Sequence, residues 1–370
     1  MKVAIVQEWL VSVGGSDKVT RDLLDLFPGS DLFTIVYEDK TLKELGIRVN
    51  RIHTTFLQKS NFLRKHFRSF LPLFPYLVEQ FDLSDYDIII SSSHTVAKGV
   101  ITGPNQLHIC YCHSPVRYAW DKYHEYLRDH GLKSGFKNLI VRYTLHRLRL
   151  WDVVSSNRVD YFIANSHFVS RRIKKYYNRD SKVIYPPIEV DKFSLNEDKH
   201  DYFVTASRLV PYKRINIIIE AFNKMPEKRL LVIGDGPEMK RLKSIANDNV
   251  ELLGYIREEE LITKIGSAKA FVFAAEEDFG MLPVEAQACG TPVIAFNRGG
   301  ARESVVDGLT GIFFEEQTSE SIINAVERFD KMSFDYKIIR KQSEKFSTDS
   351  FKESIREYVL TKYKDFQSGF

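Results

Sequence analysis

Short apolar runs alternate with longer stretches of helical spacing along almost the whole chain. In the first half, these apolar runs are 1–7, 32–37, 87–92, 107–111 and 160–164. In the second half, they are 202–206, 230–233, 250–253, 270–275, 291–296 and 311–314. Runs of this length with few polar residues are typical of strands that are buried on both faces. Because helical patterns such as 168–177 follow many of these runs, the sequence predicts an α/β fold with parallel sheets and right-handed crossovers.

The two series of apolar runs meet at residues 183–187, VIYPP, where two consecutive prolines restrict the backbone. A chain of 370 residues is long enough for two domains that each bury a core. The composition, with 44% hydrophobic and 28% charged residues, is that of a globular protein. We therefore expect a first domain over 1–180 and a second domain over 181–351.

The stretch 270–296 carries the strongest chemical signal in the sequence. An apolar run is followed by a polar loop with Glu277, by a helical segment over 281–288 with Glu285, and by a second apolar run. In parallel sheets, ligands bind beyond the carboxyl ends of the strands, where this loop is expected. Carboxylates beside exposed helix amides can bind the hydroxyl groups of a polyol. The alternative is that Glu277 is a solvated loop residue and that Glu285 faces water from its helix.

The string EDFGMLPVEAQACGTPV, at 277–293, resembles the signature of the retaining glycosyltransferases of family 4. In that family, one Glu follows another after seven residues, with Phe-Gly after the first Glu and Ala-x-Ala-x-Gly after the second. The resemblance implies the GT-B fold, in which two Rossmann-like domains with parallel sheets face a central cleft. It also implies that the C-terminal helix, within 352–370, returns to the N-terminal domain.

The same resemblance implies roles for individual residues. The string SRLVPYK fits the family pattern of cations on the donor diphosphate, and the glycine pair of the first loop is a further candidate for this contact. The implied diphosphate-binding residues are Arg208, Lys213, Gly14 and Gly15. The implied donor-sugar contacts are Phe279, Gly280, Met281 and Leu282, the ribose contact is Glu285, and the base contacts are Tyr255 and Ile256. The implied catalytic residues are Glu277 and His113, the latter in the string CYCHSPVRYAW.

Two acid-free segments of the first domain combine basic and apolar residues. Residues 45–78 hold six Lys and Arg among interleaved aromatics, and residues 130–151 hold Lys133, Lys137, Arg142, Arg147 and Arg149. Basic amphipathic segments of this kind bind anionic membrane interfaces, although each alone also fits a solvated helix face. We expect the N-terminal domain to contact an anionic membrane surface. No nucleic-acid motif accompanies the charge, so nucleic acid is not an expected partner.

The remaining composition indicates a reducing compartment. Only three cysteines are present, and no apolar run approaches the roughly 20 residues that a membrane span needs. The chain goes directly into a strand-like run, so we expect no signal peptide. The expected location is the cytoplasm, at the inner face of a bacterial membrane.

Two sequence motifs resemble metal-binding motifs, but neither has the features that a metal site needs. Asp85 and Asp87 form an Asp-x-Asp that precedes its strand instead of ending it. Cys110 and Cys112 share one face of a strand with His113 beyond them, and the sequence offers no second pair of ligands. We therefore expect neither a metal nor a cofactor.

The sequence thus predicts a retaining, metal-independent glycosyltransferase that moves a hexose from a nucleotide sugar to a lipid-linked or polysaccharide acceptor. The string CYCHSPVRYAW most resembles the branch with bacterial O-antigen mannosyltransferases, which favours GDP-mannose as the donor. Two alternatives stay open. One is a sugar-nucleotide epimerase of the same fold, and the other is a catalytically idle glycan-binding or scaffold protein.

Overall fold

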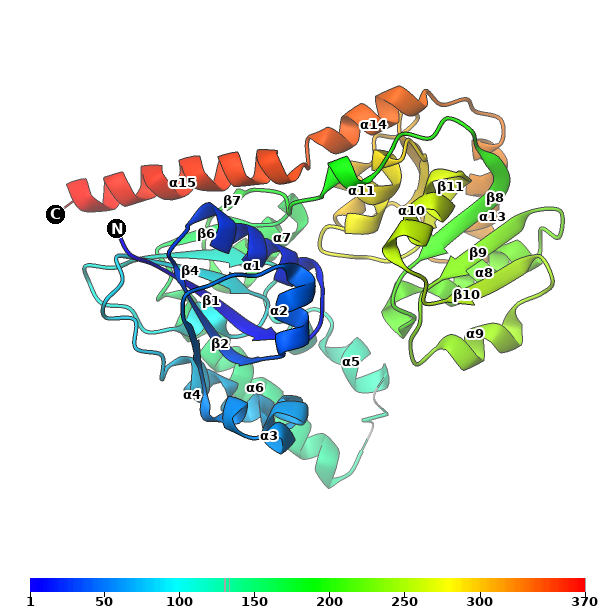
Figure 1. Cartoon of the computed structure of the whole chain (residues 1–370). Helices are drawn as coiled ribbons and strands as arrows, with labels where there is room; N and C mark the ends of the chain where they lie inside the picture. The colour runs from blue at the N-terminus through cyan, green and yellow to red at the C-terminus, as the bar shows by residue number, and fades with distance from the viewer. Residues whose placement is uncertain (130, 133, 370) are drawn as a thin grey trace. The chain divides into compact units, whose positions relative to one another are not determined.

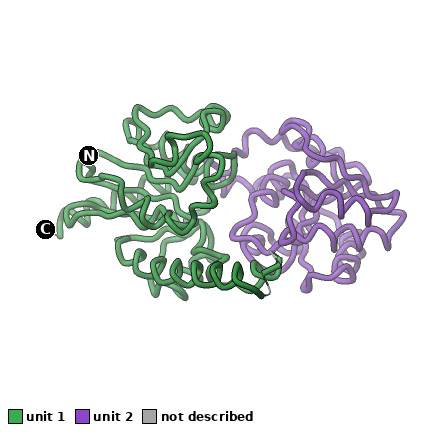
Figure 2. The backbone as a smooth tube through the Cα atoms, turned by 90° about the horizontal axis from the view of Figure 1, so that it is seen from below, with its two compact units in different colours: residues 1–187, 349–370 green, residues 188–348 purple. Residues whose placement is uncertain are grey.

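The computed structural model describes residues 1–129, 131–132 and 134–369 (Figure 1). Two residues of the second basic segment, His130 and Lys133, therefore lie outside the described residues. The chain forms two compact units, residues 1–187 with 349–370 and residues 188–348 (Figure 2). The first boundary follows the proline pair Pro186-Pro187, whereas the sequence pattern placed it at 180/181.

Unit 1 is built on a parallel sheet whose described strands have the order β3-β2-β1-β4-β5-β6-β7. The strands are β1 (Val3–Leu10), β2 (Asp31–Tyr37), β3 (Ile52–Thr54), β4 (Ile88–Ser93), β5 (Leu107–Cys112), β6 (Tyr161–Ala164) and β7 (Ser181–Val183). The α-helices are α1 (Gly15–Leu26), α2 (Asp39–Leu45), α3 (Asn61–Lys65), α4 (Phe74–Val78), α5 (Tyr123–Asp129), α6 (Phe136–Ser156), α7 (His167–Tyr177) and α15 (Thr348–Ser368). Short 3₁₀ turns are η1 (Phe56–Lys59), η2 (Phe67–Leu73), η3 (Ala97–Gly99) and η4 (Arg117–Ala119).

The C-terminal helix α15 packs on unit 1. Its residues Phe351, Ile355 and Val359, spaced at one helical turn, are buried in the same apolar cluster as β1, β4 and β5. The ring of Phe351 lies 5.7 Å from that of Tyr111 on β5. Lys352, near the start of the helix, lies 3.4 Å from the carboxylate of Asp25 on α1. Apolar burial therefore attaches the last segment of the chain to the first unit.

Unit 2 contains a second parallel sheet with the order β10-β9-β8-β11-β12-β13. Its strands are β8 (His200–Ala206), β9 (Arg229–Ile233), β10 (Val250–Gly254), β11 (Ala268–Phe273), β12 (Val293–Phe296) and β13 (Gly311–Phe314). Its α-helices are α8 (Ile215–Asn223), α9 (Met239–Ile245), α10 (Glu258–Gly266), α11 (Met281–Ala288), α12 (Ala301–Ser304), α13 (Ser319–Phe329) and α14 (Tyr336–Glu344). The 3₁₀ turns η5 (Val190–Lys192) and η6 (Pro211–Lys213) complete it.

Each sheet has a point where the strand order reverses. In unit 1, the first strand β1 lies between β2 and β4, and in unit 2 the first strand β8 lies between β9 and β11. The loops that leave two such neighbouring strands diverge to opposite faces, which opens a crevice at the carboxyl edge of the sheet. The predicted α/β class with two parallel sheets is confirmed, and the reversals indicate where ligands are expected. Within the described part of the chain, no helix is long and apolar enough to cross a bilayer.

Candidate active site

The loop after β8 carries the first pair of predicted cations in unit 2. Arg208 is exposed in this loop, and Lys213 ends the 3₁₀ turn η6 just before α8. Arg214 takes a left-handed conformation with φ of 57° between the turn and the helix. The loop begins at the strand reversal, so both cations stand at the carboxyl edge of the sheet.

Two glycines of the neighbouring loop allow this cation loop to lie where it does. A Cβ on Gly234 would come within 1.8 Å of the carbonyl oxygen of Ser207, and one on Gly236 within 2.4 Å of that of Leu209. The Leu209 N–H donates to the carbonyl of Asp235 at 2.9 Å. The string GDGP is therefore required by close backbone packing against the cation loop.

The loop after β11 brings Glu277 to the cations. The Lys213 ammonium forms an ion pair with Glu277 Oε1, and the two side chains are 14% and 19% exposed. The family resemblance implies separate roles for these two residues, at the diphosphate and at the sugar, and the structure brings them into contact. A basic and an acidic group in contact at one edge can hold a phosphate oxygen and a sugar hydroxyl side by side.

A glycine pair after β12 fixes the loop that carries Glu277. The Gly300 N–H donates to the Glu277 carbonyl at 2.9 Å. A Cβ on Gly299 would come within 2.5 Å of the same carbonyl oxygen, and one on Gly300 within 2.2 Å of the Phe279 Cα atom. Sequence reasoning missed Gly299 and Gly300, although a Gly-Gly pair two residues after a predicted strand is a signal for close backbone approach.

The predicted sugar and ribose contacts begin helix α11. Gly280, with φ of 86°, is the N-cap residue of the helix and has no side chain that could form a capping hydrogen bond. Phe279 is buried, with its ring 5.4 Å from that of Phe346, so its contribution to a ligand is limited to its backbone. Glu285 lies one turn further along α11 and is half-buried.

The predicted base contacts lie at the far side of the same edge. Tyr255 and Ile256 follow β10, after Gly254 with its left-handed φ of 75°, and the Tyr255 side chain is 82% exposed. The strand order places the loops after β10, β9, β8, β11 and β12 in one row. Unit 2 thus gathers all of its predicted site residues along one sheet edge.

Unit 1 has a second polar cluster at its own strand reversal, centred on Glu8 of β1. The Glu8 side chain is fully buried, and its Oε1 accepts hydrogen bonds from the backbone N–H groups of residues 94, 95, 96 and 97 at 2.7–3.1 Å. Its Oε2 lies 3.0 Å from Nδ1 of His94. Burial alone raises the pKa of Glu8, but the pairing with His94 and the amides outweigh it and hold that pKa well below its usual range. The same carboxylate raises the pKa of His94 against the opposing effect of burial.

Asp17 and His113 complete this cluster. Asp17, in the first turn of α1, accepts a hydrogen bond from Gln7 Nε2 at 3.2 Å, and burial raises its pKa to about 6. A Cβ on Gly14 would lie 3.2 Å from the Asp17 carboxylate, so the glycine pair of the sequence prediction adjoins an acid. His113 Nε2 lies 2.9 Å from Ser92 Oγ, and burial with the nearby His94 lowers its pKa to about 3. His113 is therefore a neutral imidazole at physiological pH.

Comparison with known proteins follows the division into two units. Residues 187–346 match the family model of glycosyl transferases group 1, and residues 13–192 match that of glycosyltransferase family 4. The chain belongs to glycosyltransferase family 4.

Relatives of this glycosyltransferase are identical to it at about a quarter of the aligned residues. An uncharacterized glycosyltransferase of Methanocaldococcus jannaschii is 26% identical over 262 residues, 62% of this chain and 65% of that protein. A GDP-mannose-dependent alpha-(1-6)-phosphatidylinositol monomannoside mannosyltransferase of Mycolicibacterium smegmatis is 27% identical over 229 residues, 53% and 58% of the two chains. The matches thus span less than two thirds of each relative.

A solved structure extends the similarity over both units. HepE of Anabaena, determined in complex with UDP, superimposes with a TM-score of 0.71 at 19% identity, covering 98% of this chain and 100% of that one. At this identity the likeness shows the fold, and the predicted GT-B architecture is confirmed.

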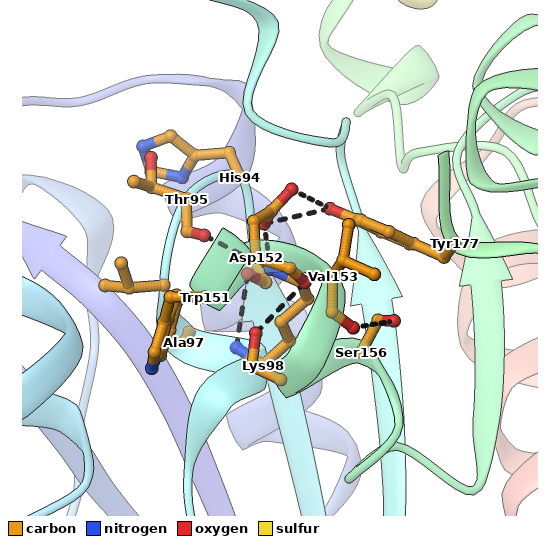
Figure 3. A network of polar contacts seen from close by, with 12 residues as sticks. His94, Thr95, Ala97, Lys98, Trp151, Asp152, Val153, Ser156 and Tyr177 are labelled. Atoms are coloured by element: carbon orange, nitrogen blue, oxygen red, sulfur yellow. Dashed lines mark hydrogen bonds and ion pairs between the residues drawn. The ribbon is translucent and has the colours of Figure 1, made fainter. Parts of the chain in front are cut away.

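In this glycosyltransferase, a buried ion pair supports the loop that holds Glu8. Lys98 Nζ pairs with Asp152 of α6, and both side chains are at most 2% exposed. Asp152 also accepts a hydrogen bond from Tyr177 OH at 2.9 Å (Figure 3). It accepts another from Trp120 Nε1 at 2.7 Å. Since Lys98 directly follows the amides of residues 94–97, the pair holds the Glu8-binding loop against α6.

Sequence reasoning found part of the cluster in unit 1. The sequence predicts a role for His113. Glu8 and Asp17 received no role, although a Glu near the end of an otherwise apolar, buried strand is a recognisable signal. The pairing of Lys98 with Asp152 could not be predicted from the sequence, because the packing of α6 is what brings these two residues together. Across the described residues, no group of three or more potential ligands is arranged to hold a metal ion.

Proposed function

We propose that this protein is a retaining hexosyltransferase that uses a nucleotide-sugar donor without a metal ion. The observation that carries the proposal is the Lys213–Glu277 ion pair, which joins the loop that carries Arg208 to the loop that leads into α11. This edge presents donors for an anionic diphosphate and an acceptor for sugar hydroxyls within one loop system. Membership of glycosyltransferase family 4 supports the reaction class.

The chemistry assigns a separate task to each group. The bond between the anomeric carbon and the diphosphate oxygen breaks, and the acceptor oxygen forms the new bond to that carbon while its proton passes to the departing diphosphate. Negative charge grows on the departing diphosphate, where Lys213, Arg208 and the α11 amides stabilise it most strongly in the transition state. Positive charge grows on the sugar, where Glu277 stabilises it. Glu285 binds the ribose, and His113 remains our proposed contact to the donor sugar.

GDP-mannose is our proposed donor. The support is that the Mycolicibacterium smegmatis relative is a GDP-mannose-dependent mannosyltransferase, whereas HepE was solved with UDP. A thermal-shift series with GDP-, UDP- and ADP-sugars decides between them, followed by measurement of free nucleotide. We expect GDP-mannose to raise the melting temperature most and to be turned over. Binding without any nucleotide release would instead favour the idle glycan-binding protein, and interconversion of two nucleotide sugars would favour the epimerase.

Our proposal of metal independence has its own test. Since the cations and amides of unit 2 would neutralise the diphosphate, EDTA should leave turnover nearly unchanged. Strong inhibition by EDTA that Mn²⁺ reverses would contradict this part of the proposal.

We propose further that the acceptor is lipid-linked and that unit 1 binds the inner face of a bacterial membrane, in the synthesis of a surface glycan such as an O-antigen. The support is the combination of basic and exposed apolar side chains over η1–α4 and α6. Co-sedimentation should require anionic vesicles and weaken with salt. Reversal of Arg64, Lys65 and Arg68 together should release the protein from the vesicles, and unchanged binding would exclude this surface.

A further inference from the structure

A groove in unit 1 runs between the η2–α4 segment and helix α6. Leu71, Pro72 and Pro75 line one wall, and Tyr143, Leu148 and Trp151 line the other. Its volume is about 300 Å³. This volume is at the lower end of the range for small-molecule sites in proteins, and the walls are predominantly apolar, as in such sites.

Helix α6 exposes a second apolar face beside this groove. Its inward face buries Leu145, Leu148 and Asp152. The opposite face follows the helical repeat with steps of three and four residues, and its apolar members are 49–78% exposed. These members are Phe136, Ile140, Tyr143, Leu150 and Val154, with Arg147 in the same row. A water-exposed helix has no need of such a row, so this face is suited to an apolar environment.

Trp151 makes the deep wall of the groove rigid. Its Nε1 donates to Glu79 Oε1 at 2.9 Å, and Glu79 is itself paired with Arg158 at 2.7 Å. The Lys98 ammonium lies 5.4 Å from the ring centroid of Trp151, and Figure 3 shows the ring beside Lys98 and next to Asp152. A Cβ on Gly99 would come within 2.2 Å of the ring. The groove is therefore preformed, and the acid near its deep wall is already neutralised.

The charge around the groove is positive. Arg147 lines the groove and is exposed, and the segment 45–78 that supplies the other wall contains no acid. A guanidinium binds a phosphate through two parallel hydrogen bonds while its aliphatic stem packs on apolar surface. An apolar slot with a cation at its mouth matches a hydrocarbon chain that ends in an anionic head group.

We propose that this groove binds one hydrocarbon chain of an anionic membrane lipid, with Arg147 at the lipid phosphate. The proposal rests on the membrane contact of unit 1 proposed above. An interfacial helix places its apolar face at the depth where lipid chains begin, so the groove would open toward chains instead of water. A single chain seated in the groove would hold unit 1 in one orientation on the membrane.

The test uses the tryptophan fluorescence of the full chain with vesicles of phosphatidylglycerol whose chains carry bromine, a contact quencher. All three tryptophans of the protein, Trp9, Trp120 and Trp151, belong to unit 1. Brominated vesicles should quench the emission, and the Trp151→Phe variant should lose most of this quenching. Brominated phosphatidylcholine should quench much less, because it lacks net charge.

Two substitutions on α6 separate the groove from the surrounding surface. Thr144→Phe fills the groove and should abolish the Trp151 quenching, whereas Leu150→Phe, on the same helix outside the lining, should preserve it. Arg147→Glu should lower the affinity for phosphatidylglycerol about fivefold or more for each unit of charge changed, and Arg147→Lys should retain most of it.

Co-sedimentation distinguishes the possible failures. Vesicle binding with quenching that does not depend on Trp151 or Thr144 would overturn the groove proposal while leaving membrane docking intact. Absence of vesicle binding together with a dimeric mass in solution would assign the groove to a second copy of the chain and overturn the proposal. Neither result depends on nucleotide-sugar turnover, which tests the proposed reaction separately.

Discussion

Glu277 and Glu285 are eight positions apart in one motif, but the structure gives them different surroundings. Glu277 lies in a loop, paired with Lys213 and held by the Gly299-Gly300 backbone. Glu285 lies on helix α11. A carboxylate beside the reacting carbon stabilises charge that exists only in the transition state, whereas one at the ribose binds ground state and transition state alike.

The first prediction separates these two roles by kinetics. Glu285→Gln should raise KM for the donor and leave kcat largely unchanged, because it removes uniform binding. Glu277→Gln should lower kcat with a smaller effect on KM. Initial rates with the donor varied at saturating acceptor provide the comparison. Identical profiles for the two variants would contradict the division of roles.

The second prediction concerns the cations at the diphosphate. Lys213→Ala and Arg208→Ala should each reduce kcat by about a hundredfold or more, since each removes a charge-assisted contact to a growing negative charge. Lys224→Ala is the matched control, because Lys224 also forms an ion pair in unit 2 but with Glu320, on the surface. Near wild-type turnover by both Lys213→Ala and Arg208→Ala would show that the diphosphate binds elsewhere.

The third prediction follows from the pKa of Asp17, which burial raises from 3.8 to about 6. Between pH 4 and pH 6, the folded state retains a proton that the unfolded state has lost, so stability falls as pH rises through this window. Above pH 6, the full cost is on the order of 3 kcal/mol. Asp17→Asn should therefore stabilise unit 1 at pH 8 and have little effect near pH 4.

Chemical denaturation of the Asp17→Asn variant at the two pH values measures this effect. Asp25→Asn, an exposed position on the same helix, is the control and should change little at either pH. A destabilised Asp17→Asn variant at pH 8 would show that the ionised carboxylate supports the fold. The predicted increase in the free energy of unfolding at pH 8 would instead show that the ionised Asp17 destabilises the fold. Acids that lower stability in this way are typical of functional sites.

At the scale of elements, strands were predictable and short turns were not. Most strands of the two sheets are buried on both faces, so their apolar runs are visible in the sequence, whereas β3, β7 and β10 are partly exposed. Strand β3 has only three residues, all partly exposed, and carries no comparable pattern. The segment 61–78 is divided into the short helices α3, η2 and α4, with Pro72 inside η2 and Pro75 in the first turn of α4. The basic amphipathic pattern of this segment does not predict where one helix ends and the next begins.

The loops of the candidate site were predictable for a related reason. Ligand-binding loops follow the carboxyl ends of parallel strands, so Arg208, Lys213 and Glu277 could be assigned to one edge. The partners of Glu8 could not be found in this way. They are backbone N–H groups of residues 94–97, which have no side-chain signature and lie more than 80 positions away.

The fourth prediction tests the ion pair that joins the 94–97 loop to α6. Asp152→Ala should destabilise unit 1 by about 3–5 kcal/mol, because it leaves the Lys98 charge buried without a partner. The double variant with Lys98→Met should recover part of this loss. Unfolding in urea, followed by the tryptophans of unit 1, measures both variants.

The matched control for Asp152 is Asp180→Ala, which removes the exposed pair with Lys174 and should change stability by less than about 1 kcal/mol. Equal effects of Asp152→Ala and Asp180→Ala would contradict the view that the buried pair supports the Glu8-binding loop.

At the scale of the whole molecule, each unit supplies one group of candidate residues at the point where its strand order reverses. Unit 2 supplies the cations, Glu277 and Glu285, and unit 1 supplies Glu8, Asp17, His94 and His113. Unit 1 also carries the apolar face of α6 and the groove beside it. We therefore propose that unit 2 binds the donor and that unit 1 contacts the membrane.

The most direct test of this account is transfer of labelled mannose from GDP-mannose to the lipid fraction of bacterial membranes. We expect the label to enter the lipid fraction together with release of GDP, and Lys213→Ala and Glu277→Gln to reduce both signals about a hundredfold. Absence of nucleotide release with every nucleotide sugar, or equal release by wild type and both variants, would contradict glycosyl transfer at the Lys213–Glu277 site.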